Sequence, residues 1–259
     1  MFGVARDKQD WPSGPAGQTA YVVGDIHGRL DLLDQLLERV HRDIAERRPE
    51  KTLIVFLGDL LDRGPDSAGV VERLRTYRGG GVRTIFLLGN HEEVLLRILA
   101  GEARLIPSWL KFGGAQCLRS YGGDPLRIAT LGDEAAVEAI RGVIPPEHLE
   151  FISGFADTCR FGDYLFVHAG IRPGIELDQQ AQQDLRWIRE PFLGDDTDHG
   201  FVVIHGHTIR PEIEERPNRI GIDTGAYATG VLTALVIDGP KRRHLDTRPP
   251  VDAAVPAMH

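Results

Sequence analysis

Five apolar runs in this chain end on residues of the types that bind metal ions. The runs are YVVGDIHG at 21–28, TLIVFLGD at 52–59, TIFLLGNH at 84–91, YLFVHAG at 164–170 and FVVIHGH at 201–207. Such runs are typical of buried strands, and the ends of parallel strands meet at one edge of a sheet. The recurrence predicts an open sheet whose strand ends hold two metal ions, and therefore metal-assisted phosphoester chemistry.

Asp25 and His27 are two residues apart where the first run ends. In an extended strand this spacing lets both side chains face the same cavity. One carboxylate with one imidazole suits Mn, Fe or Zn better than Ca or Mg. Alone, the pair fits equally a capped turn before a helix that starts near Arg29, so its interpretation as a metal site depends on the other strand ends.

The second run continues into GDLLDRG at 58–64, a glycine-bounded loop with two carboxylates and a guanidinium. We predict Asp59 to be a bridging ligand, because its two oxygens can bind two cations held about 3.5–4 Å apart. Asp62 and Arg63 alone would be interpreted as a surface ion pair. Next to a strand-end carboxylate, Arg63 is predicted to hold two phosphate oxygens.

The remaining strand ends offer an amide and several imidazoles. The Asn90 carbonyl adds a ligand without adding charge, and a protonated His91 beside it could donate to the leaving oxygen of a phosphoester. His168 and His207 are predicted to complete the shell of the second ion. His205 lies two residues before His207, and the spacing leaves the choice between them open.

Composition limits the class of protein. The chain has 259 residues, 42% hydrophobic and 26% charged, and no apolar stretch approaches the about 18 residues of a membrane helix. A net charge of −8 disfavours broad binding to nucleic acid. Cys117 and Cys159 are too few for a disulfide framework, which favours a cytoplasmic protein. We therefore expect no membrane and no nucleic-acid partner.

Alternating strand and helix patterns predict an α/β protein with a single catalytic domain over 18–240. A flexible lead is expected over 1–17, a helical insertion beside the site over 101–160, and a disordered tail over 241–259 that begins at most as a short strand. The predicted strands are 20–24, 52–57, 83–88, 161–167, 201–204, 218–222 and 230–237, and the first two predicted helices are 29–46 and 67–77.

The chain resembles the phosphoprotein phosphatase branch of the calcineurin-like metallophosphoesterases, especially the short bacterial and lambda-phage serine/threonine phosphatases. The resemblance covers roughly 20–235 and is carried by GDIHG at 24–28, GDLLDRG at 58–64, GNHEE at 89–93, HAG at 168–170 and GHT at 206–208. It implies a two-layered β-sandwich flanked by helices, in the order α/β/β/α. The C-terminal region lacks the long substrate-groove segments of the eukaryotic members, which puts selectivity for protein substrates in doubt.

The resemblance also implies roles for individual residues, and it favours His207 over His205. The first ion would be held by Asp25, His27 and Asp59, and the second by Asp59, Asn90, His168 and His207. Phosphate contacts would come from Arg63, Asn90, His91 and Arg189, with Asp62 orienting His91. Arg186 competes with Arg189, since it lies one helical turn away if 183–190 is helical.

The expected activity is hydrolysis of phosphoserine and phosphothreonine esters by a metal-bridging hydroxide, with Mn²⁺ as the first choice of ion and Fe or Zn as alternatives. The expected partner is a phosphoprotein or phosphopeptide, with small phosphoesters as further substrates. One alternative is a diadenosine polyphosphate or nucleotide hydrolase, although symmetrical tetraphosphate hydrolases usually carry Gln where this chain has His27. A non-catalytic metal-dependent binding module is the other alternative, and it would require a lost ligand position.

Overall fold

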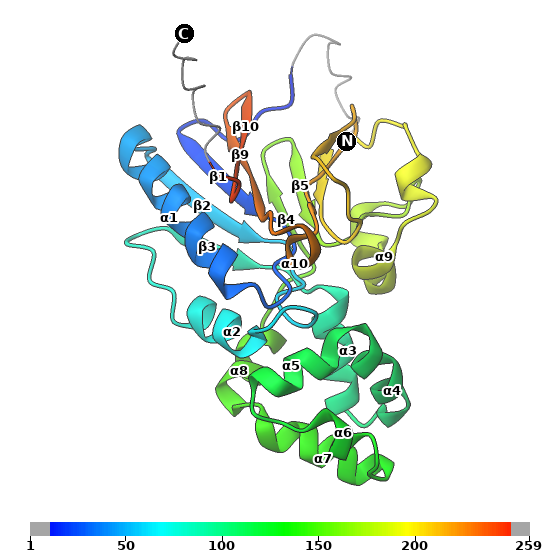
Figure 1. The fold of residues 1–259 in the computed structure, drawn as a ribbon. Coiled ribbons are helices and arrows are strands. Elements are labelled where there is room, and N and C mark those ends of the chain that lie inside the picture. The colour runs from blue at the N-terminus through cyan, green and yellow to red at the C-terminus, as the bar shows by residue number, and fades with distance from the viewer. Residues whose placement is uncertain (1–10, 250–259) are drawn as a thin grey trace, which may run out of the picture.

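The strands form two five-stranded sheets packed face to face in the computed structural model, which describes residues 11–249 (Figure 1). The first sheet has the order β10-β9-β1-β2-β3, with β1 (Gln18–Val23), β2 (Lys51–Phe56), β3 (Arg83–Phe86), β9 (Thr233–Asp238) and β10 (Lys241–Asp246). The second has the order β4-β5-β6-β8-β7, with β4 (Thr158–Phe161), β5 (Tyr164–Val167), β6 (Val202–His205), β7 (Glu214–Glu215) and β8 (Arg219–Gly221).

Helices cover the outer faces of both sheets, which confirms the predicted α/β/β/α layers. Side chains alternate along β1, so that Ala20 and Val22 face the second sheet while Tyr21 and Val23 face α1 (Leu30–Arg47) and α2 (Ser67–Arg75). The outer face of the second sheet packs on Leu185 of α9 (Gln182–Trp187) and the residues after it. Three short helices complete this part of the chain: η3 (Leu177–Gln179), η4 (Phe192–Gly194) and α10 (Ala226–Thr229).

The insertion forms a helical lobe at one end of the sandwich (Figure 1). It begins with α3 (Asn90–Leu99) and continues through η1 (Ala103–Leu105), α4 (Ile106–Trp109), η2 (Leu110–Gly114), α5 (Ala115–Ser120), α6 (Pro125–Ile128), α7 (Asp133–Val143) and α8 (Pro146–Ser153). Its apolar side chains make their own core, which reaches Leu61 in the loop after β2. Within residues 11–249 we find no helix with both the length and the apolar composition of a membrane span.

Three predicted boundaries are wrong. The single strand predicted over 161–167 is the hairpin β4–β5, because the chain turns at Gly162 with a left-handed φ of +60°. The part of the lead after residue 10 is packed: Tyr164 Oη donates to Pro12 O (2.8 Å), and Gly14 N donates to Gly239 O (2.9 Å).

The tail expected to be disordered from 241 begins with the short strand that the sequence left open: β10 pairs along its whole length with β9. Arg243 of this strand also donates to Asp43 of α1. The Lys/Arg-rich composition gives no apolar alternation that would predict the full strand, since β10 is an edge strand on which charged side chains are tolerated. Residues 1–10 and 250–259 of the predicted lead and tail lie outside the described residues.

Strand direction decides where the loops go. The strands β1, β2 and β3 are parallel, and so are β5, β6 and β8. The loops that leave their carboxyl ends therefore gather at one end of the sandwich, where the helical lobe also lies.

Candidate metal centre

Asp59 lies between two groups of metal-type side chains. One group is His27, Asp59 and His91, and the other is Asp59, His168 and His207; within each, the candidate ligand atoms lie within 4.8 Å of one another. All five residues are buried. The structure thus brings together residues from five loops that are far apart in sequence, around one shared carboxylate.

The second group has lone pairs that face one another. His168 Nδ1 donates to the Leu57 carbonyl (2.9 Å), so the Nε2 atom of the neutral ring carries a lone pair. This Nε2 faces the Asn90 Oδ1 oxygen at 3.0 Å and Asp59 Oδ1 at 3.5 Å. Three electron-rich atoms without a proton among them form a fitting site for a cation.

In the first group, the His27 ring has the same arrangement as the His168 ring. Its Nδ1 donates to Leu61 O (2.8 Å), and its Nε2 faces Asp59 Oδ2 at 3.5 Å. Burial lowers the pKa of His27 to about 3 and that of His207 to about 3, so both rings are neutral at pH 7. Neutral imidazole is the form that binds metal.

Asp25 belongs to neither compact group, yet it lies beside them. Its Oδ2 accepts from His207 N (3.0 Å), and the His207 ring contacts Asn90 Oδ1 through Nδ1 (2.8 Å). Asp25 Oδ1 and His207 Nε2 are both buried without a hydrogen-bond partner. Two such orphaned ligand atoms are expected where a cation is to be accommodated.

The structure separates His207 from His205. His205 ends β6 and its ring packs on Phe192 (5.1 Å between centroids), on the outer side of the second sheet. His207 turns inward because its backbone is left-handed, with φ 62°. The same break of the strand period occurs at His27 (φ 47°), so the two-residue alternation expected for Asp25 and His27 is not what positions them.

Left-handed backbone is concentrated at this centre. The non-glycine residues with positive φ in the part of the chain described here are His27, Arg48, Asp59, Asp62, Arg63 and His207. All except Arg48 belong to the centre or its loop. Such conformations cost about 1–3 kcal/mol each and persist where the surrounding structure enforces them, typically at functional sites.

His91 is held in an arrangement that favours its charged form. Its Nδ1 lies 2.6 Å from Asp62 Oδ2, which favours the charged ring, whereas the Arg63 guanidinium 3.2 Å from its Nε2 opposes it. Burial alone would lower the pKa of His91, but the Asp59 and Asp62 carboxylates outweigh it and raise the pKa to about 9. The Trp109 indole donates to Asp62 (3.0 Å) and fixes that carboxylate.

Glu92 supports the whole loop, a role that sequence reasoning missed. Glu92 lies in the first turn of α3, and its fully buried carboxylate accepts from the backbone N–H groups of Asp59 (2.8 Å), Leu60 (2.8 Å), Leu61 (3.1 Å) and Gly89 (3.2 Å). The sequence signal is the first of the two acids in GNHEE. Its partners became visible only in three dimensions.

Arg189 and Arg186 occupy different places. The helix predicted over 183–190 ends at Trp187, and Arg189 beyond it lines the cavity above the centre. Arg186 donates from Nε and NH2 to Asp157 Oδ1 (2.9 and 2.6 Å) and lies 3.5 Å from Glu93. Arg189 is therefore the one of the two that faces the site.

The centre forms the floor of a cavity of about 410 Å³, within the range of small-molecule sites. Two residues not predicted belong to it or border it. Asp223 lines the cavity, and burial raises its pKa to about 6. Tyr227 places its ring under the Arg63 guanidinium (4.7 Å) and against His27 (5.4 Å).

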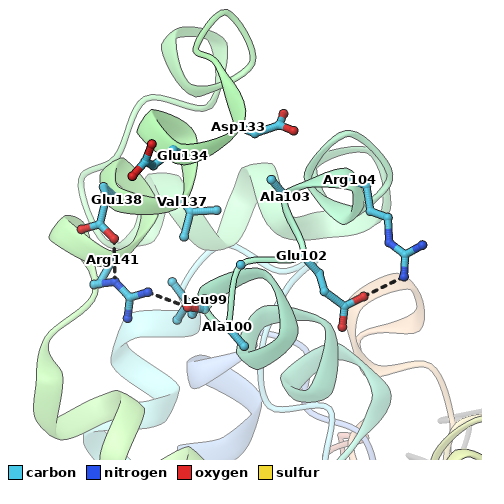
Figure 2. Close-up of a pocket in the computed structure, with 11 residues that line it drawn as sticks. Leu99, Ala100, Glu102, Ala103, Arg104, Asp133, Glu134, Val137, Glu138 and Arg141 are labelled. Atoms are coloured by element: carbon cyan, nitrogen blue, oxygen red, sulfur yellow. Dashed lines mark hydrogen bonds and ion pairs between the residues drawn. The ribbon is translucent and has the colours of Figure 1, made fainter.

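A larger depression of about 700 Å³ lies on the helical lobe, between the end of α3 and α7 (Figure 2). Its basic side chains are bonded to neighbours, Arg141 to Leu99 O and Glu138, and Arg104 to Glu102. No residue of the two metal-type groups lines it. Volume alone therefore does not identify the reactive site.

Comparisons with known proteins agree with this geometry. The model of the calcineurin-like phosphoesterase family matches residues 19–229. Serine/threonine-protein phosphatase 1 of Salmonella typhimurium is 32% identical over 82% of this chain and 89% of its own length. The symmetrical bis(5'-nucleosyl)-tetraphosphatase of Methylococcus capsulatus is 31% identical over 92% of this chain and 95% of its own length.

A solved structure gives the same fold. The crystal structure of a putative diadenosine tetraphosphatase superposes with a TM-score of 0.62 at 23% identity, over 88% of this chain and 93% of that one. The match of the family model spans the strands and the loops that build the centre. The chain belongs to the calcineurin-like phosphoesterase family.

Proposed function

We propose that this protein hydrolyses phosphoserine and phosphothreonine monoesters with the help of two divalent ions. The observation that carries the proposal is Asp59, which is shared by the two groups and whose carboxylate oxygens face the neutral imidazoles of His27 and His168. Two ions there would supply an activated water as nucleophile and offset the charge of the phosphate. His27, Asp59 and Asp25 would hold one ion, and Asp59, Asn90, His168 and His207 the other, with Mn²⁺ as our first choice.

The side chains around the ions have separate tasks. Arg63 and Arg189 would bind the phosphate oxygens, because both line the cavity and a guanidinium matches phosphate geometry. Asn90 would contact the phosphate as well as an ion. His91, whose Nδ1 is held by the Asp62 carboxylate (2.6 Å), would donate a proton to the departing serine or threonine oxygen.

Substrate comparison tests this proposal. The protein, purified without added metal and analysed for Mn, Fe and Zn, would be assayed with a phosphoserine peptide, p-nitrophenyl phosphate and diadenosine tetraphosphate. We expect phosphate release from the peptide that a chelator abolishes and Mn²⁺ restores. Turnover of the tetraphosphate with a kcat/KM far above that of the peptide would contradict the proposal and favour the dinucleoside polyphosphate hydrolase, whose relatives match this chain at similar identity.

A further inference from the structure

We propose that the outer half of the cavity binds a planar aromatic group on the leaving-group side of the phosphoester, and that Phe112 selects for it. The inference rests on the proposed function, because it assumes phosphoester hydrolysis at the floor of the same cavity. It concerns which esters are preferred.

The residues that line the cavity are of two chemical kinds. The floor is made by the polar residues of the centre, whereas Val94, Leu105, Trp109, Phe112 and Trp187 also line it. A phosphate and two ions would fill only part of a cavity of about 410 Å³. The rest of the leaving group must therefore meet largely apolar and aromatic surface.

The two tryptophans are fixed through their polar edges. Trp109 Nε1 donates to Asp62 (3.0 Å), and Trp187 Nε1 donates to Glu93 (3.0 Å). Nε1–H is the one hydrogen-bonding group of an indole, so each ring has only apolar surface left to offer a ligand. Trp187 is partly exposed and can contact an aromatic group without rearranging, whereas Trp109, which is 3% exposed, contributes only a buried part of the cavity wall.

Phe112 is a large apolar side chain left exposed at this cavity. It is 62% exposed, and of the exposed large hydrophobic residues in 11–249 it alone lines the cavity. It sits where helical geometry breaks, next to Gly113 with φ 125°. Gly113 O accepts from Arg63 N (3.3 Å), so the phenyl ring is tied to the loop that is proposed to bind phosphate.

The charges argue against a second phosphate in the outer half. Besides Arg63 and Arg189, the arginine that lines the cavity is Arg97. Its Nε and NH2 donate to Glu102 (2.8 and 2.8 Å), and its NH1 lies 3.6 Å from Glu93. Because the Arg97 guanidinium is already paired with two carboxylates, an uncharged ring fits this half better than a polyphosphate chain.

Two phosphoesters, one with and one without an aromatic leaving group, test whether Phe112 selects for an aromatic ring. KM and kcat would be measured with Mn²⁺ for 1-naphthyl phosphate and for phosphoserine, using wild type, Phe112→Ala and Phe112→Leu. Leu126→Ala, another exposed apolar residue (76%) outside the cavity, is the control. We expect Phe112→Ala to raise KM for the naphthyl ester about 5–10-fold, as for the loss of one aromatic contact, and to raise KM for phosphoserine much less. Phe112→Leu should fall between, and Leu126→Ala should match wild type.

Equal changes of KM for both esters, or no change for the naphthyl ester, would overturn the proposal. Three further substrates show which kind of molecule supplies the aromatic group. They are a phosphotyrosine peptide, a phosphoserine–phenylalanine peptide compared with its alanine counterpart, and AMP. A rise of KM in Phe112→Ala for at least one supports the proposal and identifies the source. No rise for any of the three rejects it.

A binding measurement separates this inference from the proposed function. Tryptophan fluorescence would report Kd for phenylphosphonate and methylphosphonate, since Trp109 and Trp187 line the cavity. We expect tighter binding of the phenyl compound, with the difference lost in Phe112→Ala. A chain that hydrolyses none of the esters but retains this preference would contradict the proposed function and leave the aromatic subsite standing; equal Kd values in wild type would reject the subsite.

Discussion

Asp59 is the residue that both groups of candidate metal ligands share. Its Oδ1 accepts from His91 N (3.0 Å) and faces His168 at 3.5 Å, while its Oδ2 faces His27 at 3.5 Å. Burial raises its pKa, but the surrounding imidazoles outweigh this effect and hold the pKa below its ordinary value. A carboxylate that remains ionised although buried is suited to bind cations on both of its oxygens.

His91→Asn tests the proton-donor role. Serine alkoxide is a poor leaving group and p-nitrophenolate a good one, so the loss of an acid should matter mainly for the serine ester. We expect kcat to fall about 100-fold or more on a phosphoserine peptide and about 10-fold or less on p-nitrophenyl phosphate. Equal losses on both substrates would remove the acid role and leave His91 as a phosphate contact.

Arg189→Ala and Arg186→Ala form a second pair of variants. Arg189 faces the cavity, so its loss should lower kcat/KM by about 10–100-fold, equivalent to about 1.4–2.8 kcal/mol, without changing Tm. Arg186 is bonded to Asp157 and lies near Glu93, so its loss should lower Tm and change kcat/KM less. Kinetics and thermal melts of both variants decide, and the opposite pattern would reassign the phosphate contact to Arg186.

Among the elements, the break between α4 and α5 links the helical lobe to the centre. Gly113 packs against the Asp62–Arg63 loop so closely that a Cβ atom there would lie 2.5 Å from Arg63 N. Its φ of 125° is also unfavourable for any other residue. The helical lobe therefore contacts the backbone of Arg63, the arginine predicted to bind phosphate.

We expect Gly113→Ala to lower kcat/KM at least about 10-fold, because the loop must shift. Gly101→Ala is the matched control: Gly101 has a similar φ of 106°, but a Cβ atom there would meet nothing within 4 Å. Both variants carry the cost of about 1 kcal/mol or more for a left-handed non-glycine residue. If the two lose activity equally, the contact with the loop is not what matters.

Asp43 on α1 anchors the edge strand β10. Burial raises its pKa, but hydrogen bonds from Tyr21, Arg243 and Arg47 outweigh this and lower the pKa overall. A lowered folded pKa stabilises the protein above the unfolded value of about 3.9, and the stabilisation is lost as pH falls through the folded value.

Asp43→Asn should therefore cost about 1–3 kcal/mol at pH 7, and the difference from wild type should shrink as the pH falls below about 4. Urea unfolding at both pH values measures it. Asp34→Asn on the same helix is the control, since its ion pair with Arg73 is exposed and worth less than about 1 kcal/mol. A cost for Asp43→Asn that did not depend on pH would contradict the assignment.

At the scale of the whole molecule, the fold concentrates negative charge where the sheets meet the loops. The buried carboxylates there are Asp25, Asp59, Asp62, Glu92 and Asp223. Burial, followed by the charges of Asp223 and Asp59, raises the pKa of Asp25 well above its usual range. Bound cations would relieve this repulsion, so metal binding is expected to stabilise the native state.

An ion at about 100 times its Kd adds about 2.7 kcal/mol, which raises Tm by about 5–10 °C in a chain of this size. Differential scanning fluorimetry with Mn²⁺ and with a chelator measures this shift. Asp59→Asn should lose most of it, because both groups share that carboxylate. A Tm that is the same with and without Mn²⁺ would count against a metal centre.

The sequence by itself determined the strands, the α/β class and the residues that gather at the strand ends. Long apolar runs form buried strands in almost any context, and their ends carried Asp59, Asn90, His168 and His207. The parallel order of the strands then makes those ends converge. The charged edge strand β10 was expected at most as a short strand, because an edge needs no apolar alternation.

Residue spacing did not decide between neighbours of the same type; the family resemblance favoured His207 and Arg189, and only the tertiary structure gives the physical reason. His207 rather than His205, and Arg189 rather than Arg186, face the cavity because of a left-handed turn and a helix end that local pattern does not reveal. The role of Glu92 depends on backbone N–H groups about 30 residues away. Side-chain direction after a strand ends depends on φ and on long-range hydrogen bonds, and residue spacing carries no record of either.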